Sequence, residues 1–147
     1  MTKEILLSLK GLQMESKEDA QSTETITPAD YYQRNGSHYV VYEEIMEGFT
    51  APTRNRIKFN GSCMEVSKKG LVNVQMLFEE NKKNMTNYTT PYGNILIGID
   101  TESILVEEKE NQIRVEVEYA LEANYQHLAD CRIEMKLRPR EEGINLL

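Results

Sequence analysis

Histidine and cysteine come first, because they most often supply a base, a nucleophile or a metal ligand near neutral pH. The chain has two of each: His38, His127, Cys63 and Cys131. His127 and Cys131 lie four residues apart in a stretch that alternates like a β-strand, which separates them by roughly 13 Å at about 3.3 Å per residue. A nucleophilic cysteine must touch its base, so this pair cannot be a catalytic dyad.

The surroundings of these four residues favour structural roles. His38 directly follows a turn signal, where we expect an exposed polar side chain. His127 shares its predicted face with apolar residues, so we expect a hydrogen-bonded ring that lines the interior near one end of a barrel. The cysteines lack the Cys or His spacing of a zinc site, which favours reduced, packed thiols. The chain also has no Gly-rich phosphate loop, Gly-x-Ser-x-Gly or Cys-x-x-Cys. We expect no catalytic residue, metal or cofactor.

A cluster of cations is the next candidate. Arg54, Arg56 and Lys58 alternate with residues that include Ile57 and Phe59. Turned inward, the cations would form an anion site, because arginine binds carboxylates and phosphates in a bidentate manner. The apolar side of the same segment is already suited to face a core, which favours a solvated outer face for the cations.

Tyrosine is the remaining signal. The chain has eight Tyr and three Phe, and tyrosine rings could form a wall with hydroxyls directed at a small ligand. Tyrosine is also a good strand former whose hydroxyl often lies at the rim of a core, and this packing role is the alternative. The predicted ligand site contains Tyr32, Tyr42 and Tyr88, with Arg56 if a bulge turns its strand inward.

The elements that position these residues are organised around the segment from Thr90 to Gly93, Thr-Pro-Tyr-Gly. Proline fixes φ and glycine suits the end of a type I turn, so the segment predicts a hairpin corner. Ile95, Ile97 and Ile99 follow with period 2 and should share one buried face. Gly98 lies on the other face, where a bulge or a close neighbour is expected.

Two Asn-Gly pairs, Asn35-Gly36 and Asn60-Gly61, predict further hairpin turns. An opening strand is expected from about Lys3 to Met14, followed by a polar connector from Ser16 to Ser22. Pro28 interrupts a β-branched run, and a central strand does not tolerate proline. It should therefore lie at a bulge or on an edge.

The last two strands carry the clearest alternation. Their apolar residues should face inward and their charged residues should face solvent, since one register decides both sets. The inward set is Ile113, Val115, Val117, Tyr119, Ile133, Met135 and Leu137, and the outward set is Arg114, Glu116, Glu118, Arg132 and Glu134. Pro139 should end the last strand, and residues 139–147 are expected to be a frayed tail.

No window of the chain shows a convincing helical period, and nine or ten strands joined by short turns indicate an all-β antiparallel meander. A sandwich and a closed barrel both fit, and closure favours the barrel because it removes exposed edges. At 147 residues the chain fits a single domain, residues 1–147. The fold class predicted is an antiparallel barrel of eight to ten strands.

The corner and its surroundings also resemble a known family. Tyr88-Thr89-Thr90-Pro91-Tyr92-Gly93, followed by Ile95-Leu96-Ile97-Gly98, is similar to the YwiB-like family of uncharacterised bacterial barrel proteins, as are Tyr31-Tyr32 and the final pair of strands. The similarity runs from about Lys3 to Arg138. It implies a barrel of the lipocalin or calycin type and carries no assigned activity.

Charge limits the partners. Seventeen Lys and Arg against 24 Asp and Glu give a net charge of −7, which repels phosphate backbones and anionic lipid, so neither nucleic acid nor a membrane is expected. The start of the chain lacks the features of a signal peptide, and we expect the cytosol. Two functions remain: a non-enzymatic barrel that binds a small, partly apolar molecule, or an interaction module with a filled interior that meets a partner or its own copy through an outer face or an edge strand.

Overall fold

The computed structural model describes residues 3–11, 24–45 and 48–140, and their regular structure is entirely β. The ten strands are β1 (Glu4–Lys10), β2 (Glu24–Arg34), β3 (Ser37–Ile45), β4 (Pro52–Phe59), β5 (Cys63–Lys69), β6 (Val74–Glu79), β7 (Lys82–Thr90), β8 (Gly93–Lys109), β9 (Gln112–Ala123) and β10 (Gln126–Pro139). No helix in these ranges is long and apolar enough to cross a membrane.

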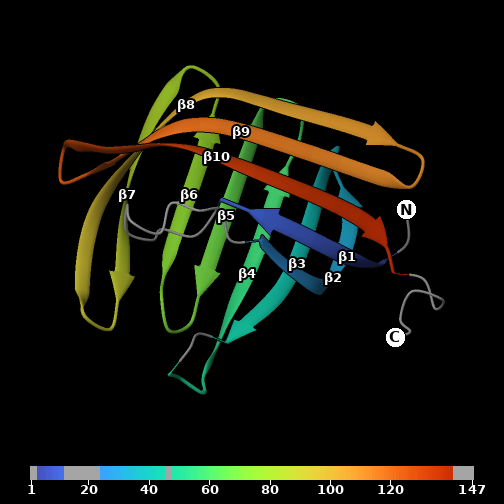
Figure 1. Ribbon diagram of the computed structural model, residues 1–147, viewed down its shortest axis with the longest axis horizontal. Helices are drawn as coiled ribbons and strands as arrows, with labels where there is room; N and C mark the ends of the chain where they lie inside the picture. Colours follow the sequence, from blue (N-terminus) through green and yellow to red (C-terminus); the bar gives the residue numbers. More distant parts are fainter. Residues whose placement is uncertain (1–2, 12–23, 46–47, 141–147) are drawn as a thin grey trace.

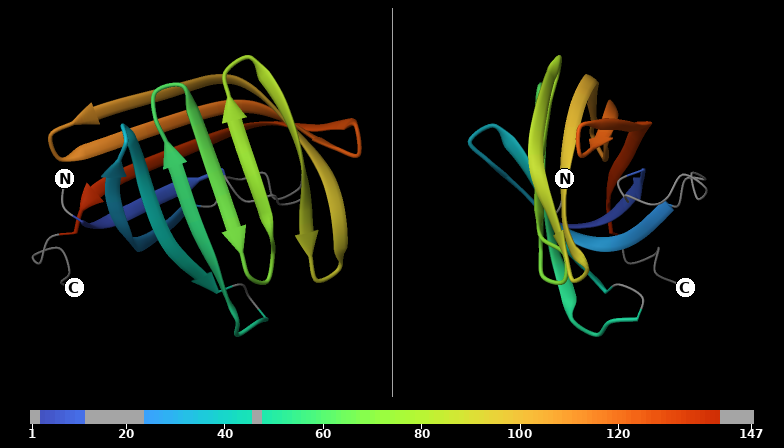
Figure 2. Two further views of the ribbon diagram at one scale, coloured as in Figure 1. Left: turned by 180° about the vertical axis from the view of Figure 1, so that it is seen from behind. Right: turned by 90° about the vertical axis from the view of Figure 1, so that its left-hand side faces the viewer.

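All ten strands belong to one antiparallel sheet with the order β6-β5-β4-β3-β2-β1-β10-β9-β8-β7. Sequence neighbours pair throughout except between β6 and β7, and β10 returns to pair with β1. The sheet curls so that β8, β9 and β10 cross over β3 to β6 (Figures 1 and 2). Asn73 and Thr89 join the two sheet edges by a pair of backbone hydrogen bonds of 2.8 and 2.9 Å. The result is a nearly closed barrel, as the sequence predicted.

The predicted turns occur where expected. Asn35 and Gly36 have φ of 51° and 80°, the consecutive positive values of a type I′ hairpin turn between β2 and β3. Asn60 lies in the turn between β4 and β5, where its side-chain Oδ1 accepts backbone N–H groups from Ser62 and Cys63 at 3.0 and 3.2 Å. These contacts fix both hairpins locally, which is why the Asn-Gly pairs could be recognised from sequence.

The Thr90 to Gly93 corner joins β7 to β8, and the Thr90 hydroxyl accepts the Tyr92 N–H at 3.0 Å. Ile97 and Ile99 are buried as predicted. Ile95 is 42 % exposed, so its predicted burial is wrong. Its face is correct, but it lies two residues from the turn, where little of the opposing sheet covers it. Gly98 is in close contact with its neighbours, since a Cβ there would lie 2.9 Å from the Met85 sulfur.

The orientation predicted for β9 and β10 is confirmed. All seven apolar residues of the inward set are buried, and the charged set is exposed or half-buried on the other face. Pro139 ends β10, as expected. Residues 12–14 of the predicted opening strand, the Ser16 to Ser22 connector and residues 141–147 of the predicted tail lie outside the described residues.

Pro28 lies on an edge. β2 pairs with β1 from Glu24 to Asp30, whereas its pairing with β3 begins only at Asp30 and runs to Arg34. Pro28 therefore sits on the half of β2 whose second side is unpaired, where its missing N–H costs no ladder hydrogen bond. On the N-terminal side of Asp30 the two strands diverge, which leaves a hollow of about 440 Å³ between them.

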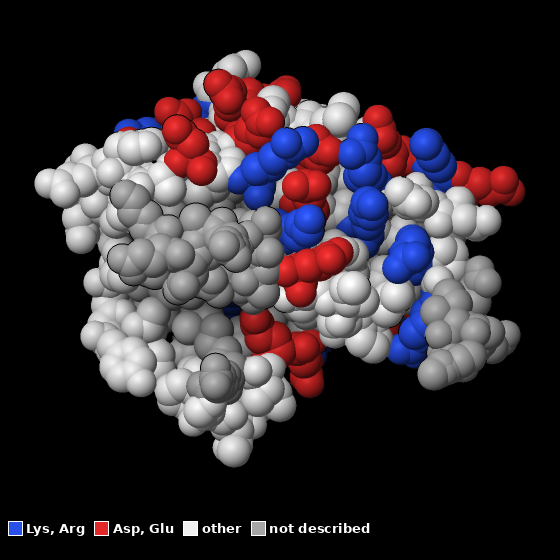
Figure 3. Space-filling view, viewed as in Figure 1, with Lys and Arg blue, Asp and Glu red and all other residues white. Residues whose placement is uncertain are grey.

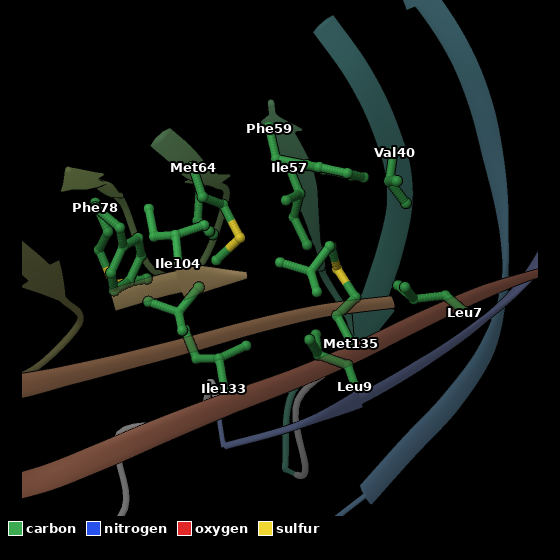
Figure 4. Close-up of a cluster of buried hydrophobic side chains, with 14 of the residues drawn as sticks. Leu7, Leu9, Val40, Ile57, Phe59, Met64, Phe78, Ile104, Ile133 and Met135 are labelled. Atoms are coloured by element: carbon green, nitrogen blue, oxygen red, sulfur yellow. The ribbon is translucent and has the colours of Figure 1, made fainter. Parts of the chain in front are cut away.

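One apolar cluster fills the interior and receives residues from both crossing halves of the sheet. Figure 4 shows side chains of β4, β5 and β6 directed toward those of β1, β8 and β10. Side chains with no exposed surface include Leu7, Val40, Ile57, Phe59, Met64, Phe78, Ile133 and Met135. Each such burial contributes roughly 1.5–3 kcal/mol relative to exposure. The barrel is therefore closed around packed side chains over most of its length.

Candidate functional site

The four predicted ligand residues fall into two places. Tyr42 is buried and Tyr88 packs against the core, both on inward faces at the end of the barrel where β3 ends and β4 begins. Tyr32 and Arg56 are exposed on the outer face of β2 to β4. The strand of Arg56 has no inward-turning bulge, so its solvated outer position is the one that the alternation favoured.

The inner place is a polar end of an otherwise apolar interior. Inward positions are apolar in the middle of β3 and at one end of β4 and of β5, and they become Glu44, Asn55 and Lys68 at the other end of each strand. Lys68 Nζ donates to Asn55 Oδ1 at 2.7 Å and to Glu44 Oε1 at 3.2 Å, and Asn55 Nδ2 donates to the same Glu44 oxygen at 3.0 Å. Lys68 is only 7 % exposed, and burial of an ammonium requires such partners.

Thr53 occupies the next inward position of β4 beyond Asn55. It has no exposed surface, and its hydroxyl has no hydrogen-bond partner among the described residues. Gly70 packs its backbone against this segment, since a Cβ there would lie 2.6 Å from the Pro52 carbonyl oxygen. A buried hydroxyl without a partner costs roughly 1–3 kcal/mol. Thr101, elsewhere in the barrel, has a hydroxyl of the same kind, so the buried Lys68 on the neighbouring strand is what distinguishes the Thr53 position.

Tyr42 and Tyr88 complete the polar end. Burial, and then the Glu44 carboxylate, raise the pKa of Tyr42 well above its usual value, and the same two causes raise the pKa of Tyr88. Both hydroxyls therefore stay protonated near neutral pH and remain hydrogen-bond donors. We define Tyr42, Glu44, Thr53, Asn55, Lys68 and Tyr88 as the polar end of the barrel.

The polar end combines one ion pair with two protonated phenols. Its ammonium is already neutralised by a carboxylate, and its phenols are held protonated. General-base or nucleophilic chemistry needs a group that can give up or take a proton near neutral pH. What the arrangement offers is several fixed hydrogen-bond donors beside an apolar interior.

The outer place is built around Tyr39, a residue that the sequence analysis did not select. Tyr32 and Tyr39 are directly opposite each other on β2 and β3, and their rings stack with centroids 4.8 Å apart and planes at 5°. The Arg56 guanidinium lies 5.8 Å and the Lys58 ammonium 5.7 Å from the Tyr39 ring centroid. Tyr39 thus links the predicted Tyr32 and Arg56, and cross-strand register was the signal that would have identified it.

His38 is buried, so the expectation of an exposed side chain is wrong. Its ring stacks on Phe59 with centroids 4.7 Å apart, and its nitrogens contact Tyr31 Oη at 2.7 Å and Glu108 Oε2 at 3.1 Å. Gln33 Nε2 donates to the Tyr31 oxygen at 2.8 Å and lies 3.5 Å from His38 Nδ1. The chain of hydrogen bonds ties the β2-β3 hairpin to the end of β8.

His127 does not line the interior, in contrast to the expectation. Its side chain is exposed near the β9-β10 turn, 3.7 Å from Asp130. A register shift between His127 and Ala129 interrupts the alternation that would have carried the inward face to this residue. Cys63 and Cys131 are free and half-buried, as expected. No three His, Cys, Asp or Glu residues within the described ranges form a group that could hold a metal ion.

Comparison with known proteins places this chain in a family. The model of the family described as "Domain of unknown function (DUF1934)" matches residues 7–135. The chain belongs to the DUF1934 family. None of the curated proteins compared with it matches. Among solved structures, the ywiB protein from Bacillus subtilis has a similar fold, with a TM-score of 0.78 and 18 % identity over 95 % of this chain and 93 % of that one.

The DUF1934 match and the similarity to ywiB confirm the family that the corner motif suggested, and with it the barrel. The family description carries no activity, and identity this low shows the fold alone. The polar end and the outer face must therefore be interpreted from their own geometry. Glu44, Asn55 and Lys68 were missed because each reads in sequence as an ordinary surface residue.

Proposed function

We propose that the protein is a non-enzymatic binding protein that holds a small, partly apolar molecule at the polar end of its barrel. The observation that carries this proposal is the Thr53 hydroxyl, which is fully buried without a partner in a cluster that also contains a buried lysine. The preferred head group is a carbonyl or carboxylate, because Thr53, Tyr42 and Tyr88 can all donate hydrogen bonds to it.

The energetics of the cluster support a role beyond stability. Replacement of a buried ion pair by packed apolar side chains is often neutral or stabilising, so a barrel selected only for stability has little use for Lys68 and Glu44 inside it. The rest of the interior shows that apolar filling is available to this fold. A polar end that lowers stability fits a binding site, where polar groups fix the orientation of a ligand.

The absence of turnover is part of the proposal. It rests on the neutralised Lys68 and on the phenols whose raised pKa keeps them protonated. We also infer a barrel of the lipocalin or calycin type, supported by the up-and-down strand order, and a cytosolic location, supported by two free half-buried thiols.

The test is native mass spectrometry of protein purified from its own cells, followed by thermal shift against pools of lipids, nucleotides and aromatic carboxylates. A ligand at 100 times its dissociation constant stabilises the fold by about 2.7 kcal/mol. We expect Tyr42→Phe and Tyr88→Phe, which remove only hydroxyls, to weaken binding about tenfold each. Tyr32→Phe, on the outer face, is the matched control and leaves the shift unchanged.

The alternative is an interaction module, and the packed apolar interior favours it. A filled barrel has no central cavity for a ligand, and its outer faces and strand edges are then the surfaces that meet a partner or a second copy. A preparation that retains no ligand, shows no shift with any pool and keeps the same melting temperature after Tyr42→Phe would decide for this module.

A further inference from the structure

The two halves of the sheet differ in how many of their outward cations form ion pairs, although Lys136 and Arg138 of β10, within the described residues, form none. On the outer face of β8 to β10, Arg114 and Arg132 form ion pairs with Glu107 and Glu116, and Lys83 of β7 pairs with Glu122. The mixed charge of the face that β8 to β10 present is visible in Figure 3. These pairs follow the usual pattern of a solvated sheet, in which opposite charges meet across strands.

The outer face of β2 to β5 differs. Its cations form no ion pair within the described residues, and the carboxylates on this face are Glu24, Asp30, Glu43 and Glu65. We define the outer basic face as the cations Arg34, Arg54, Arg56, Lys58 and Lys69 together with Tyr32 and Tyr39. Five cations against four carboxylates leave this face positive by one charge, on a chain whose net charge is −7.

Of the three cations on β4, Arg56 alone lacks a carboxylate as a direct cross-strand neighbour, because Glu43 lies opposite Arg54. Arg56 lies opposite Val41 on one side and Ser67 on the other, so no carboxylate is its direct cross-strand neighbour. Glu65 lies opposite Lys58 but is hydrogen-bonded to Gln75. Arg54, Arg56 and Lys58 alternate along one strand, which spaces their side chains roughly 6.6 Å apart at about 3.3 Å per residue.

Aromatic rings lie beside this row of cations. Tyr32 is 40 % exposed, and its ring stacks on that of Tyr39. A further flat ring that contacted the exposed part of Tyr32 would extend this stack. A row of cations with adjacent exposed aromatic rings is the combination by which proteins bind single-stranded nucleic acid, since bases stack on the rings and the cations contact phosphates.

We propose that the outer basic face binds single-stranded nucleic acid, with a base on Tyr32 and consecutive phosphates on Arg54, Arg56 and Lys58. The net charge argues against nucleic acid only as an average over the whole molecule. The Debye length is about 8 Å at physiological salt, so the local field of the face governs contacts made on it. Binding is sequence-tolerant, because every base has a face that can stack.

The test uses the intact protein and a short fluorescein-labelled oligouridylate, with binding followed by fluorescence anisotropy. Three phosphate contacts predict a slope of about −2 for log affinity against log salt between about 50 and 200 mM, and Arg56→Gln should make the slope shallower by about 0.7. Tyr32→Leu should weaken binding roughly five- to a hundredfold through loss of stacking. Lys136→Gln and Tyr92→Leu remove an exposed cation and an exposed ring elsewhere and serve as controls.

Poly-glutamate as a competitor separates a nucleic acid from an acidic protein partner. Displacement of the oligouridylate at equal charge concentration, together with unchanged affinity in Tyr32→Leu, would overturn the proposal in favour of an acidic polypeptide. No measurable anisotropy change at about 50 mM salt, or equal losses in the Lys136→Gln control, would also overturn it. Melting temperatures of all variants show that each is folded, and the polar-end ligand assay is unaffected by either outcome.

Discussion

At the residue scale, the notable groups are protonated phenols inside the barrel. Tyr42 and Tyr119 are both buried, and burial is the main cause that raises the pKa of each, followed by Glu44 for Tyr42 and by Cys131 for Tyr119. Tyr119 also packs edge to face against Phe78, with ring centroids 5.0 Å apart. Burial therefore means that the folded state favours the neutral, protonated form of both side chains.

This burial predicts a loss of stability at alkaline pH. The unfolded state releases the phenol protons near pH 10.0, whereas the folded state keeps them to higher pH. The contribution of each group is therefore fully present below pH 10 and is lost above it, at about 1.4 kcal/mol per pH unit. Urea unfolding between pH 9 and 11 measures this slope, which Tyr42→Phe and Tyr119→Phe should each make shallower. An unchanged slope in both variants would contradict the prediction, and Tyr92→Phe, at an 88 % exposed ring, is the control.

At the element scale, the polar end depends on how β5 turns toward β6. Gly70 follows β5 with a φ of 144°, and its backbone packs on Pro52 and Thr53 at the start of β4. The Asn73 side chain closes the same turn by a 2.9 Å hydrogen bond to the Gly70 carbonyl. The close approach of Gly70 to β4 fixes the position of Thr53. It also fixes the position of Asn73, whose backbone pairs with Thr89 of β7.

Gly70→Ala should therefore destabilise the fold more than glycine replacement at an open turn. Positive φ alone costs about 1–2 kcal/mol, and the contacts of the new Cβ with Pro52 and Thr53 add about 1–3 kcal/mol. Gly36→Ala is the matched control, because Gly36 also has positive φ but nothing lies within 4 Å of the position of a Cβ. Chemical denaturation measures the free energy of unfolding of both variants. Equal losses of stability would show that glycine is needed at position 70 only for its positive φ and not for the close contact with β4.

At the scale of the whole molecule, the weakest part of the barrel is the seam between β6 and β7. Every other neighbouring pair of strands shares a ladder, whereas these two are joined by the Asn73 and Thr89 bridge at one end. Along the seam, the Asn84 side chain donates to the Leu77 carbonyl at 3.2 Å and to Glu79 at 3.4 Å. The Asn84 side chain thus supplies a hydrogen bond between β6 and β7, which share no backbone ladder.

Native-state hydrogen exchange should find lower protection for seam-facing amides of β6 and β7 than for those of β1 and β10, because local opening there breaks fewer hydrogen bonds. Asn84→Ala should increase exchange along the seam and cost about 1 kcal/mol of global stability. Asn87→Ala, an exposed position on the same strand, should leave both unchanged. Uniform protection around the barrel in the wild type would mean that the seam is as stable as the ladders.

Much of the fold was predictable because its causes are local. Period-2 alternation decided which face of β9 and β10 is buried, and Asn-Gly and Thr-Pro-Tyr-Gly turns decided where hairpins close. These features depend on backbone geometry within a few residues. The same alternation placed Arg56 on the outer face of the barrel. It could not show that the Arg56 guanidinium lies over the Tyr39 ring of the neighbouring strand.

Tertiary structure decided the sites, because each gathers residues from distant segments. Glu44 contacts a lysine 24 residues away, and the buried His38 contacts a glutamate 70 residues away. Alternation assigns a side chain to a face but does not say which strand will cover it. Curvature of the sheet and its crossing over itself make that choice for Tyr88 at the polar end and for the buried histidine, whereas the outer basic face needs only the register of the consecutive strands β2 to β5.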